Sequence, residues 1–176
     1  MSERREQTMN GISNIKFDLS TACQLIISFF RLYLGAWMIV SGTSYWLHQW
    51  GYQPVFPQPF GSLPDSSKML ITFVEVGLFD LVKTLEVVGG LMLVCNLFVP
   101  LGLVILFPIS GMVFFNAIFL NLRYDGLLSV TYMGTATLYM NVILLLAYIR
   151  YYLPMLSLNA STGRLADLKR LPEIFK

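Results

Sequence analysis

Four long apolar stretches, separated by shorter polar segments, set the pattern of this sequence. The first covers residues 19–47 and is interrupted by one charge, Arg31. Residues 87–122 contain no charged side chain at all, and the last apolar stretch ends near residue 153. A helix that crosses a bilayer needs about 20 apolar residues. The pattern therefore predicts four membrane-spanning helices, over 19–47, 66–98, 101–121 and 128–153.

Proline, glycine and asparagine mark the breaks between these helices. Four of the eight prolines fall in residues 48–65, which predicts a loop rather than a helix. Pro100 and Gly102 predict a tight turn after residue 98, and residues 121–126 predict a second turn. We therefore expect a membrane domain over 19–153, an outer loop over 48–65, and polar tails over 1–18 and 154–176.

The composition agrees with a membrane protein. Apolar residues make up 56% of the 176-residue chain, and charged residues only 12%, against about 25% in soluble domains. The formal net charge of +2 is too small to predict a nucleic-acid partner. The expected fold class is all-α: an integral membrane four-helix bundle in contact with the lipid bilayer.

The distribution of basic residues predicts the orientation in the membrane. Cytoplasmic segments of membrane proteins are enriched in Lys and Arg, and the two tails, with the end of the last helix, hold most of those that lie outside the spans: Arg4, Arg5, Lys16, Arg150, Arg164, Lys169, Arg170 and Lys176. Only Lys68 and Arg123 fall on the opposite side. Both termini are expected in the cytoplasm, in a multi-pass protein of the inner (cytoplasmic) membrane. The C-terminal tail alternates apolar and basic residues and is expected to form an amphipathic helix on the lipid surface.

Away from the ends of the predicted spans lie the charged residues Arg31, Asp80, Lys83 and Glu86. Each costs at least ~2.5 kcal/mol at the centre of a bilayer unless it is paired or hydrated. Asp80, Lys83 and Glu86 follow one another at intervals of three, so Lys83 is able to pair with either carboxylate.

Counting along the predicted helices suggests a partner for Arg31. Arg31, Glu86 and Asn141 are equally distant from the cytoplasmic ends of their helices if those ends lie at residues 19, 98 and 153. We therefore expect an Arg31–Glu86 ion pair, with Asn141 within hydrogen-bonding reach. Two interpretations of this cluster remain open: a neutral network that fixes helix packing, or the lining of a pocket for a polar ligand or a proton.

Glycines predict where the first two helices touch. Gly35 and Gly42 lie on one face of the first span, and Gly89 and Gly90 are adjacent in the second. Small residues allow membrane helices to approach closely, so these four positions are expected to form the contact between helices 1 and 2.

The sequence contains no recognisable metal or covalent cofactor site. His48 is the single histidine, and neither Cys23 nor Cys95 belongs to a C-x-x-C motif. We expect no metal and no covalently bound cofactor, and no catalytic residue can be assigned.

Two motifs resemble those of the DoxX-like family, small four-helix membrane proteins. They are Arg31-x3-Gly35-x6-Gly42 in the first span and Glu86-x2-Gly89-Gly90 in the second, within a resemblance that covers roughly residues 31–148. Many members carry a lysine shortly after the last glycine of the first motif, where this chain has Thr43 and Ser44. The resemblance implies a membrane subunit of a quinone-linked redox complex or of an oxidative-stress complex, with a quinone as the candidate ligand.

Three functions are therefore compared. The first is a membrane subunit that is not catalytic on its own and works with other membrane or peripheral redox subunits. The second is an accessory or assembly subunit without chemistry, packed against a larger membrane complex. The third is a small transporter that uses Arg31 and Glu86, although the sequence shows no inverted repeat in its support.

Overall fold

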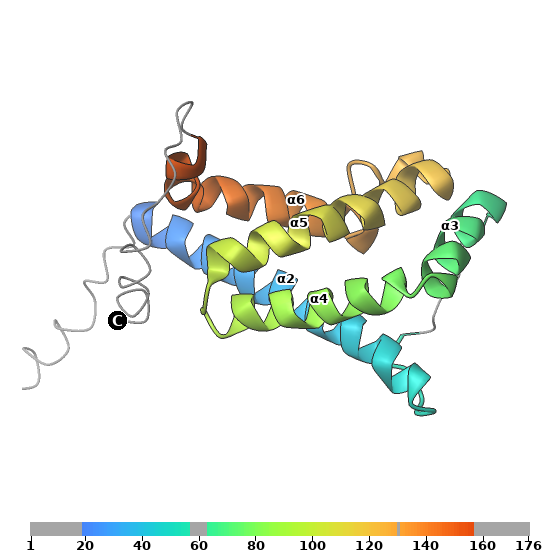
Figure 1. Cartoon of the computed structure of the whole chain (residues 1–176). Helices are drawn as coiled ribbons and strands as arrows, with labels where there is room; N and C mark the ends of the chain where they lie inside the picture. Colours follow the sequence, from blue (N-terminus) through green and yellow to red (C-terminus); the bar gives the residue numbers. More distant parts are fainter. Residues whose placement is uncertain (1–18, 57–62, 130, 157–176) are drawn as a thin grey trace, which may run out of the picture.

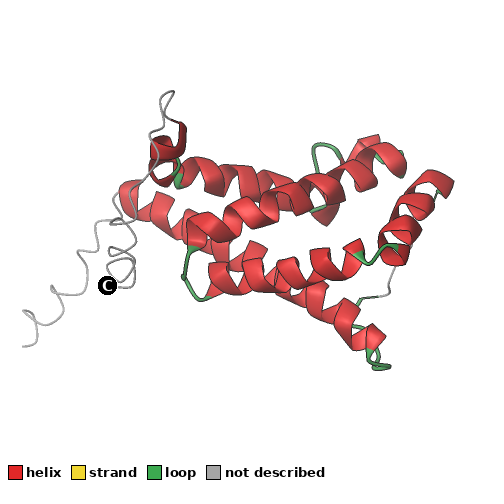
Figure 2. Ribbon diagram, in the orientation of Figure 1, coloured by secondary structure: helices red, strands yellow, loops and turns green. Residues whose placement is uncertain are grey.

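The computed structural model describes residues 19–56, 63–129 and 131–156, and this part of the chain contains helices and no strand (Figure 2). Its five α-helices are α2 (Leu19–Gln49), α3 (Pro64–Glu75), α4 (Leu78–Val94), α5 (Val99–Phe115) and α6 (Met133–Ala147). A π-helix, η1 (Asn116–Leu120), continues α5, and short 3-10 turns lie at Tyr124–Gly126, Ile149–Tyr151 and Leu153–Leu156. The expected all-α fold class is confirmed.

Four of the helices pack side by side. α2 contacts α4, α4 contacts α5, α5 contacts α6, and α6 contacts α2. Figure 1 shows the start of α2, the turn between α4 and α5, and the end of α6 at one end of the molecule. α3 lies at the opposite end, and its main contacts are with α4 and η1.

The core between these helices is made of aliphatic side chains that are completely buried: Leu34, Leu93, Leu103, Leu106 and Leu144. Many apolar side chains on the outer faces are exposed instead, among them Leu81, Leu91 and Leu146. Two helical segments, Thr21–Gln49 and Val99–Leu120, are long and apolar enough to cross a membrane, and Met133–Ala147 is a shorter apolar helix.

The second predicted helix, over 66–98, is broken into two. α3 ends at Glu75 and α4 begins at Leu78, with Val76 and Gly77 between them. Gly77 has φ +72°, a left-handed conformation that glycine adopts without steric cost. The apolar pattern continues across this break, so hydrophobicity alone did not indicate it.

The other helix boundaries also move. α2 continues to Gln49 and Pro64 opens α3, which shortens the expected loop 48–65 at both ends. The span expected over 101–121 is α5 followed by η1, and the span expected over 128–153 is α6 followed by 3-10 turns. The tail 1–18, residues 57–62 of the loop, and residues 157–176 with the expected amphipathic helix lie outside the described residues.

Three of the four singled-out glycines lie between α2 and α4. A Cβ on Gly35 would come within 2.9 Å of the Gly90 carbonyl oxygen, and a Cβ on Gly90 within 2.7 Å of the Gly35 carbonyl oxygen. Gly42 faces the backbone of Lys83. Gly89 differs from the expectation, because it faces Leu106 of α5, 2.7 Å from its would-be Cβ. One glycine pair on α4 therefore serves two helix contacts.

Candidate functional site

An ion pair between Lys83 and Glu86 is buried inside the molecule. Lys83 Nζ lies 2.9 Å from Glu86 Oε2 and 3.0 Å from Oε1. The side chains are 12% and 2% exposed, respectively. The two residues are three apart on α4, so they lie on the same helix face. Breaking such a pair on one side leaves an unpaired charge in a medium of low polarity, which is strongly unfavourable.

Ser41 of α2 completes this polar group. Lys83 Nζ donates a hydrogen bond to Ser41 Oγ at 3.1 Å, so all three ammonium donors have an acceptor. The next residue, Gly42, permits this approach because any Cβ there would lie 2.7 Å from the Lys83 carbonyl oxygen. The glycine contact between α2 and α4 therefore places the Ser41 hydroxyl against the ion pair.

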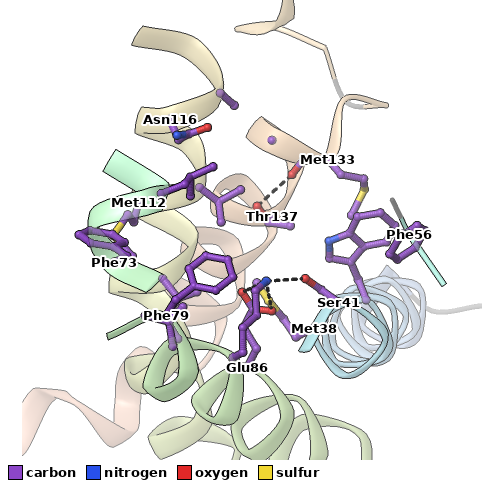
Figure 3. A pocket seen from close by; sticks show the side chains of 18 of the residues that line it. Met38, Ser41, Phe56, Phe73, Phe79, Glu86, Met112, Asn116, Met133 and Thr137 are labelled. Carbon is purple, nitrogen blue, oxygen red and sulfur yellow. Dashed lines mark hydrogen bonds and ion pairs between the residues drawn. The ribbon is translucent and has the colours of Figure 1, made fainter. Parts of the chain in front are cut away.

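Lys83, Glu86 and Ser41 line a cavity of about 460 Å³, which we call the central cavity (Figure 3). Cavities of about 300–1,000 Å³ hold small-molecule ligands in proteins. Most of the lining is apolar. It includes four methionines, whose flexible side chains adapt to the shape of a ligand, and five aromatic side chains: Met38, Met69, Met112, Met133, Trp37, Phe56, Phe73, Phe79 and Tyr132. The Lys83–Glu86–Ser41 group therefore lies beside a largely apolar part of the cavity wall.

The segment after α2 folds back to close one wall of the central cavity. The backbone N–H of Phe56 donates to Ser44 Oγ at 2.9 Å. The Phe56 ring packs against Trp37, with ring centroids 5.2 Å apart. Phe56 and Trp37 were not singled out in the sequence, because their partners are far apart in the chain and aromatic residues are common in membrane helices.

A second polar group lies at the π-helix η1. Asn116 Nδ2 donates to Ser66 Oγ of α3 at 2.8 Å, and Asn116 Oδ1 accepts from Asn121 Nδ2 at 3.0 Å. Asn116, Asn121 and Arg123 line the central cavity. Single-turn π-helices occur frequently at functional sites. η1 follows an uninterrupted apolar run, so its presence was not predicted from the sequence.

Arg31 does not pair with Glu86, and this prediction is wrong. The Arg31 guanidinium donates through Nη1 to Asn96 Oδ1 in the α4–α5 turn. The depth count assumed that the first and second helices end at the same level, whereas the start of α2 extends past the end of α4 at Val94. Packing of Gly35 on Gly90 then brings Arg31 opposite the end of α4. A cation is favourable there because the carbonyl end of a helix carries partial negative charge.

Asp80 is also outside the expected cluster. It lies in the first turn of α4, is exposed, and accepts a hydrogen bond from the Tyr45 hydroxyl. Gln49 Nε2 donates to the same hydroxyl at 2.9 Å. Lys83 therefore pairs with Glu86, one of its two candidate carboxylates. Asp80 belongs to a separate polar group with Tyr45 and Gln49, near the C-terminal end of α2.

Asn141 is fully buried in α6, but it is not bonded to Arg31 or Glu86. Neither its Oδ1 nor its Nδ2 has a hydrogen-bonding partner among the described residues, and Ser110 Oγ of α5 is likewise unpartnered. The single cluster expected from the sequence is therefore divided between the α4–α5 turn, the central cavity, the Tyr45–Asp80 contact and the α6 core.

The donor set of the central cavity is suited to hydrogen bonding. Within the part of the chain that the structure describes, no three His, Cys, Asp or Glu side chains are grouped so as to hold a metal ion. The Ser41 hydroxyl accepts from Lys83 and has a proton left to donate into the cavity. The arrangement is able to bind a neutral carbonyl group on an otherwise apolar molecule.

Comparison with known proteins found no match: neither a protein-family model, nor a curated protein, nor a solved structure corresponds to this chain. Membership of the DoxX-like family therefore stays a prediction that rests on the two sequence motifs.

Proposed function

We propose that this chain is a DoxX-like membrane subunit of a quinone-linked redox or oxidative-stress complex, and that the central cavity binds the quinone headgroup. One observation carries the proposal: a hydrogen-bonded Lys83–Glu86 pair with Ser41 at the wall of a mostly apolar cavity of about 460 Å³. A quinone headgroup is an apolar ring with carbonyl acceptors, which matches this lining.

The roles of the three polar residues follow from their hydrogen-bonding capacity. Glu86 and Ser41 occupy the donors of Lys83, so the ammonium group is held in place rather than free to bind a ligand. The Ser41 hydroxyl donates its proton to a ring carbonyl of the quinone. The Ser41 oxygen accepts a hydrogen bond from the Lys83 ammonium group, which makes the hydroxyl a stronger donor. The methionine and aromatic side chains enclose the ring and exclude water. Electrons are supplied by a partner subunit, so the chain is not catalytic on its own.

We also propose that α2, α4, α5 and α6 cross the inner membrane as a four-helix bundle with both termini in the cytoplasm. In support, these helices expose apolar side chains outward, and the basic residues concentrate in the two tails. The start of α2 and the end of α6 lie at the same end of the molecule (Figure 1), as cytoplasmic termini require.

The topology is tested with single cysteines at Ser13, Gln58 and Ser161, in a background that carries Cys23→Ser and Cys95→Ser. A membrane-impermeant thiol reagent added to intact cells should label the Gln58→Cys variant only. Labelling of the Ser13→Cys or Ser161→Cys variant under these conditions would overturn the orientation.

Quinone binding is tested by fluorescence, because Trp37 lines the central cavity and quinones quench tryptophan emission. The purified protein is titrated with a short-tailed benzoquinone and a short-tailed naphthoquinone. Ser41→Ala should weaken binding about threefold to tenfold, the effect of one hydrogen bond. Thr84→Ala is the matched control, since Thr84 lies on α4, is exposed and bonds its own helix backbone.

Two results would refute the proposal. Equal affinity of the Ser41→Ala and Thr84→Ala variants would place quinone elsewhere. No quinone binding, together with purification from native membranes in a large complex that lacks flavin and quinone, would favour the accessory-subunit function instead.

A further inference from the structure

Helix α3 forms one wall of the central cavity but is weakly attached to the rest of the molecule. Its main contacts are with α4 and η1, whereas α2, α4, α5 and α6 each pack against at least two of one another. Figure 1 shows α3 at the edge, turned away from the direction of α4. Met69, Leu70 and Phe73 are its side chains on the cavity.

The connection between α3 and α4 has the properties of a hinge. It consists of Val76 and Gly77, and Val76 is 67% exposed. Gly77 has φ +72°, and a Cβ there would meet nothing within 4 Å. Hinges are a few residues at the ends of elements that absorb changes in backbone angle. A change in the backbone angles of these two residues would therefore not bring Gly77 into contact with a packed side chain.

A buried hydrogen bond joins the other side of α3 to η1. Ser66 is fully buried, and its Oγ accepts from Asn116 Nδ2 at 2.8 Å. Asn116 is the first residue of η1 and lines the cavity. Asn121 Nδ2 donates to its Oδ1, which orients the amide toward Ser66. A single bond between neutral groups is easily broken and re-formed, as a latch requires.

From these observations we propose that α3 is a lid that opens about Val76–Gly77 to admit the ligand, with the Ser66–Asn116 hydrogen bond as its latch. The lid would provide a route by which the quinone enters its site. This inference rests on the proposed function, because it takes the central cavity as the place where the ligand binds. In the structure the Ser66–Asn116 latch is formed.

Cross-linking tests the lid directly. Ser66→Cys and Asn116→Cys are combined with Cys23→Ser and Cys95→Ser, and the two new thiols are joined by a short, reducible bis-thiosulfonate. The rate of benzoquinone binding is followed by tryptophan quenching in stopped flow. The cross-linked protein should bind at least about tenfold more slowly, as expected for an entry step controlled by lid opening, and reductant should restore the rate. An unchanged rate after complete cross-linking would overturn the lid.

A second measurement needs no ligand and therefore separates the lid from the proposed function. Thr137 is 1% exposed and lines the cavity, so in the Cys23→Ser, Cys95→Ser background the thiol introduced by Thr137→Cys should react with a small maleimide faster when α3 moves away. Adding Ser66→Ala should speed this reaction about threefold to tenfold, the effect of losing one hydrogen bond. Thr72→Ala, at an exposed position of the same helix, should leave it unchanged. Equal rates for the two variants would overturn the lid, even if quinone binds.

Discussion

Replacing Gly42 by alanine tests the contact that brings α2 against α4. The new Cβ would lie 2.6 Å from Val87 Cγ2 and 2.7 Å from the Lys83 carbonyl oxygen. Neither neighbour is able to move cheaply, since one is a branched side chain and the other is backbone. Overpacking of this kind costs about 1–3 kcal/mol.

The helix propensity of alanine opposes this cost. In a helix interior, alanine is favoured over glycine by about 1 kcal/mol. Gly111 of α5 allows this gain in helix propensity to be measured alone, because a Cβ there would meet nothing within 4 Å. Gly111→Ala should therefore stabilise the protein slightly, and the difference between the two variants should equal the packing cost of about 1–3 kcal/mol. The larger change Gly42→Leu should cost more.

The assay is reversible unfolding in mixed micelles with increasing denaturing detergent, followed by circular dichroism. Gly42→Ala should also weaken benzoquinone binding, because separating α2 from α4 moves the Ser41 hydroxyl away from Lys83. A Gly42→Ala variant as stable as the Gly111→Ala variant would refute the close contact. Normal stability with lost binding would show that the glycine acts on the cavity and not on packing.

Three further predictions concern single side chains and use the same unfolding assay. Lys83→Met should destabilise the protein by about 3–5 kcal/mol because it leaves Glu86 buried without a partner, and adding Glu86→Leu should recover most of the loss; no recovery would contradict the assignment. Asn141→Leu should be neutral or stabilising, since its amide has no described partner; a large loss would mean that the amide is bonded. Tyr152→Phe should cost about 0.5–1.5 kcal/mol by removing the 2.7 Å bond from its hydroxyl to the Pro100 carbonyl oxygen; an unchanged midpoint would refute this.

The helices and their close contacts follow from local sequence signals. Long apolar runs predict helices because backbone groups must be paired away from water. A turn was expected after residue 98 from Pro100 and Gly102; the structure has it a few residues earlier, between Val94 and Val99, with both residues inside α5. The contact role of Gly35, Gly42 and Gly90 was predicted because small residues on an apolar helix face allow another helix to approach closely.

The partners of the charged residues could not be obtained in this way. An ion pair between helices depends on their register, and an error of four residues in one helix end shifts a side chain by about 6 Å. The depth count placed residues 19 and 98 at the same level, whereas the contact of Gly35 with Gly90 sets Arg31 opposite the end of α4 at Val94, so that Asn96 in the following turn replaces Glu86 as its partner. The Lys83–Glu86 pair could be predicted without knowing the register between helices, because both residues lie on α4.

The central cavity was beyond sequence analysis for a related reason. Its walls come from six helical segments and from Phe56, and it depends on the break at Gly77 and on the π-helix η1. Both irregularities lie within or beside apolar runs that predict continuous helix. The positions of Ser66 and Asn116, which are 50 residues apart, become related only once α3 turns away from α4.

The placement of both members of the ion pair on α4 has a consequence for how the chain is made. A helix that enters a bilayer with an isolated lysine or glutamate must wait for a second helix to compensate the charge. Lys83 and Glu86 compensate each other within one turn, and Asp80 lies at the exposed start of α4. On the proposed topology, α4 therefore brings no uncompensated charge into the bilayer centre before α2 has docked. The Lys83–Glu86 pair is therefore able to form before the helices assemble, and Ser41 joins it later, when α2 packs against α4 and the cavity forms.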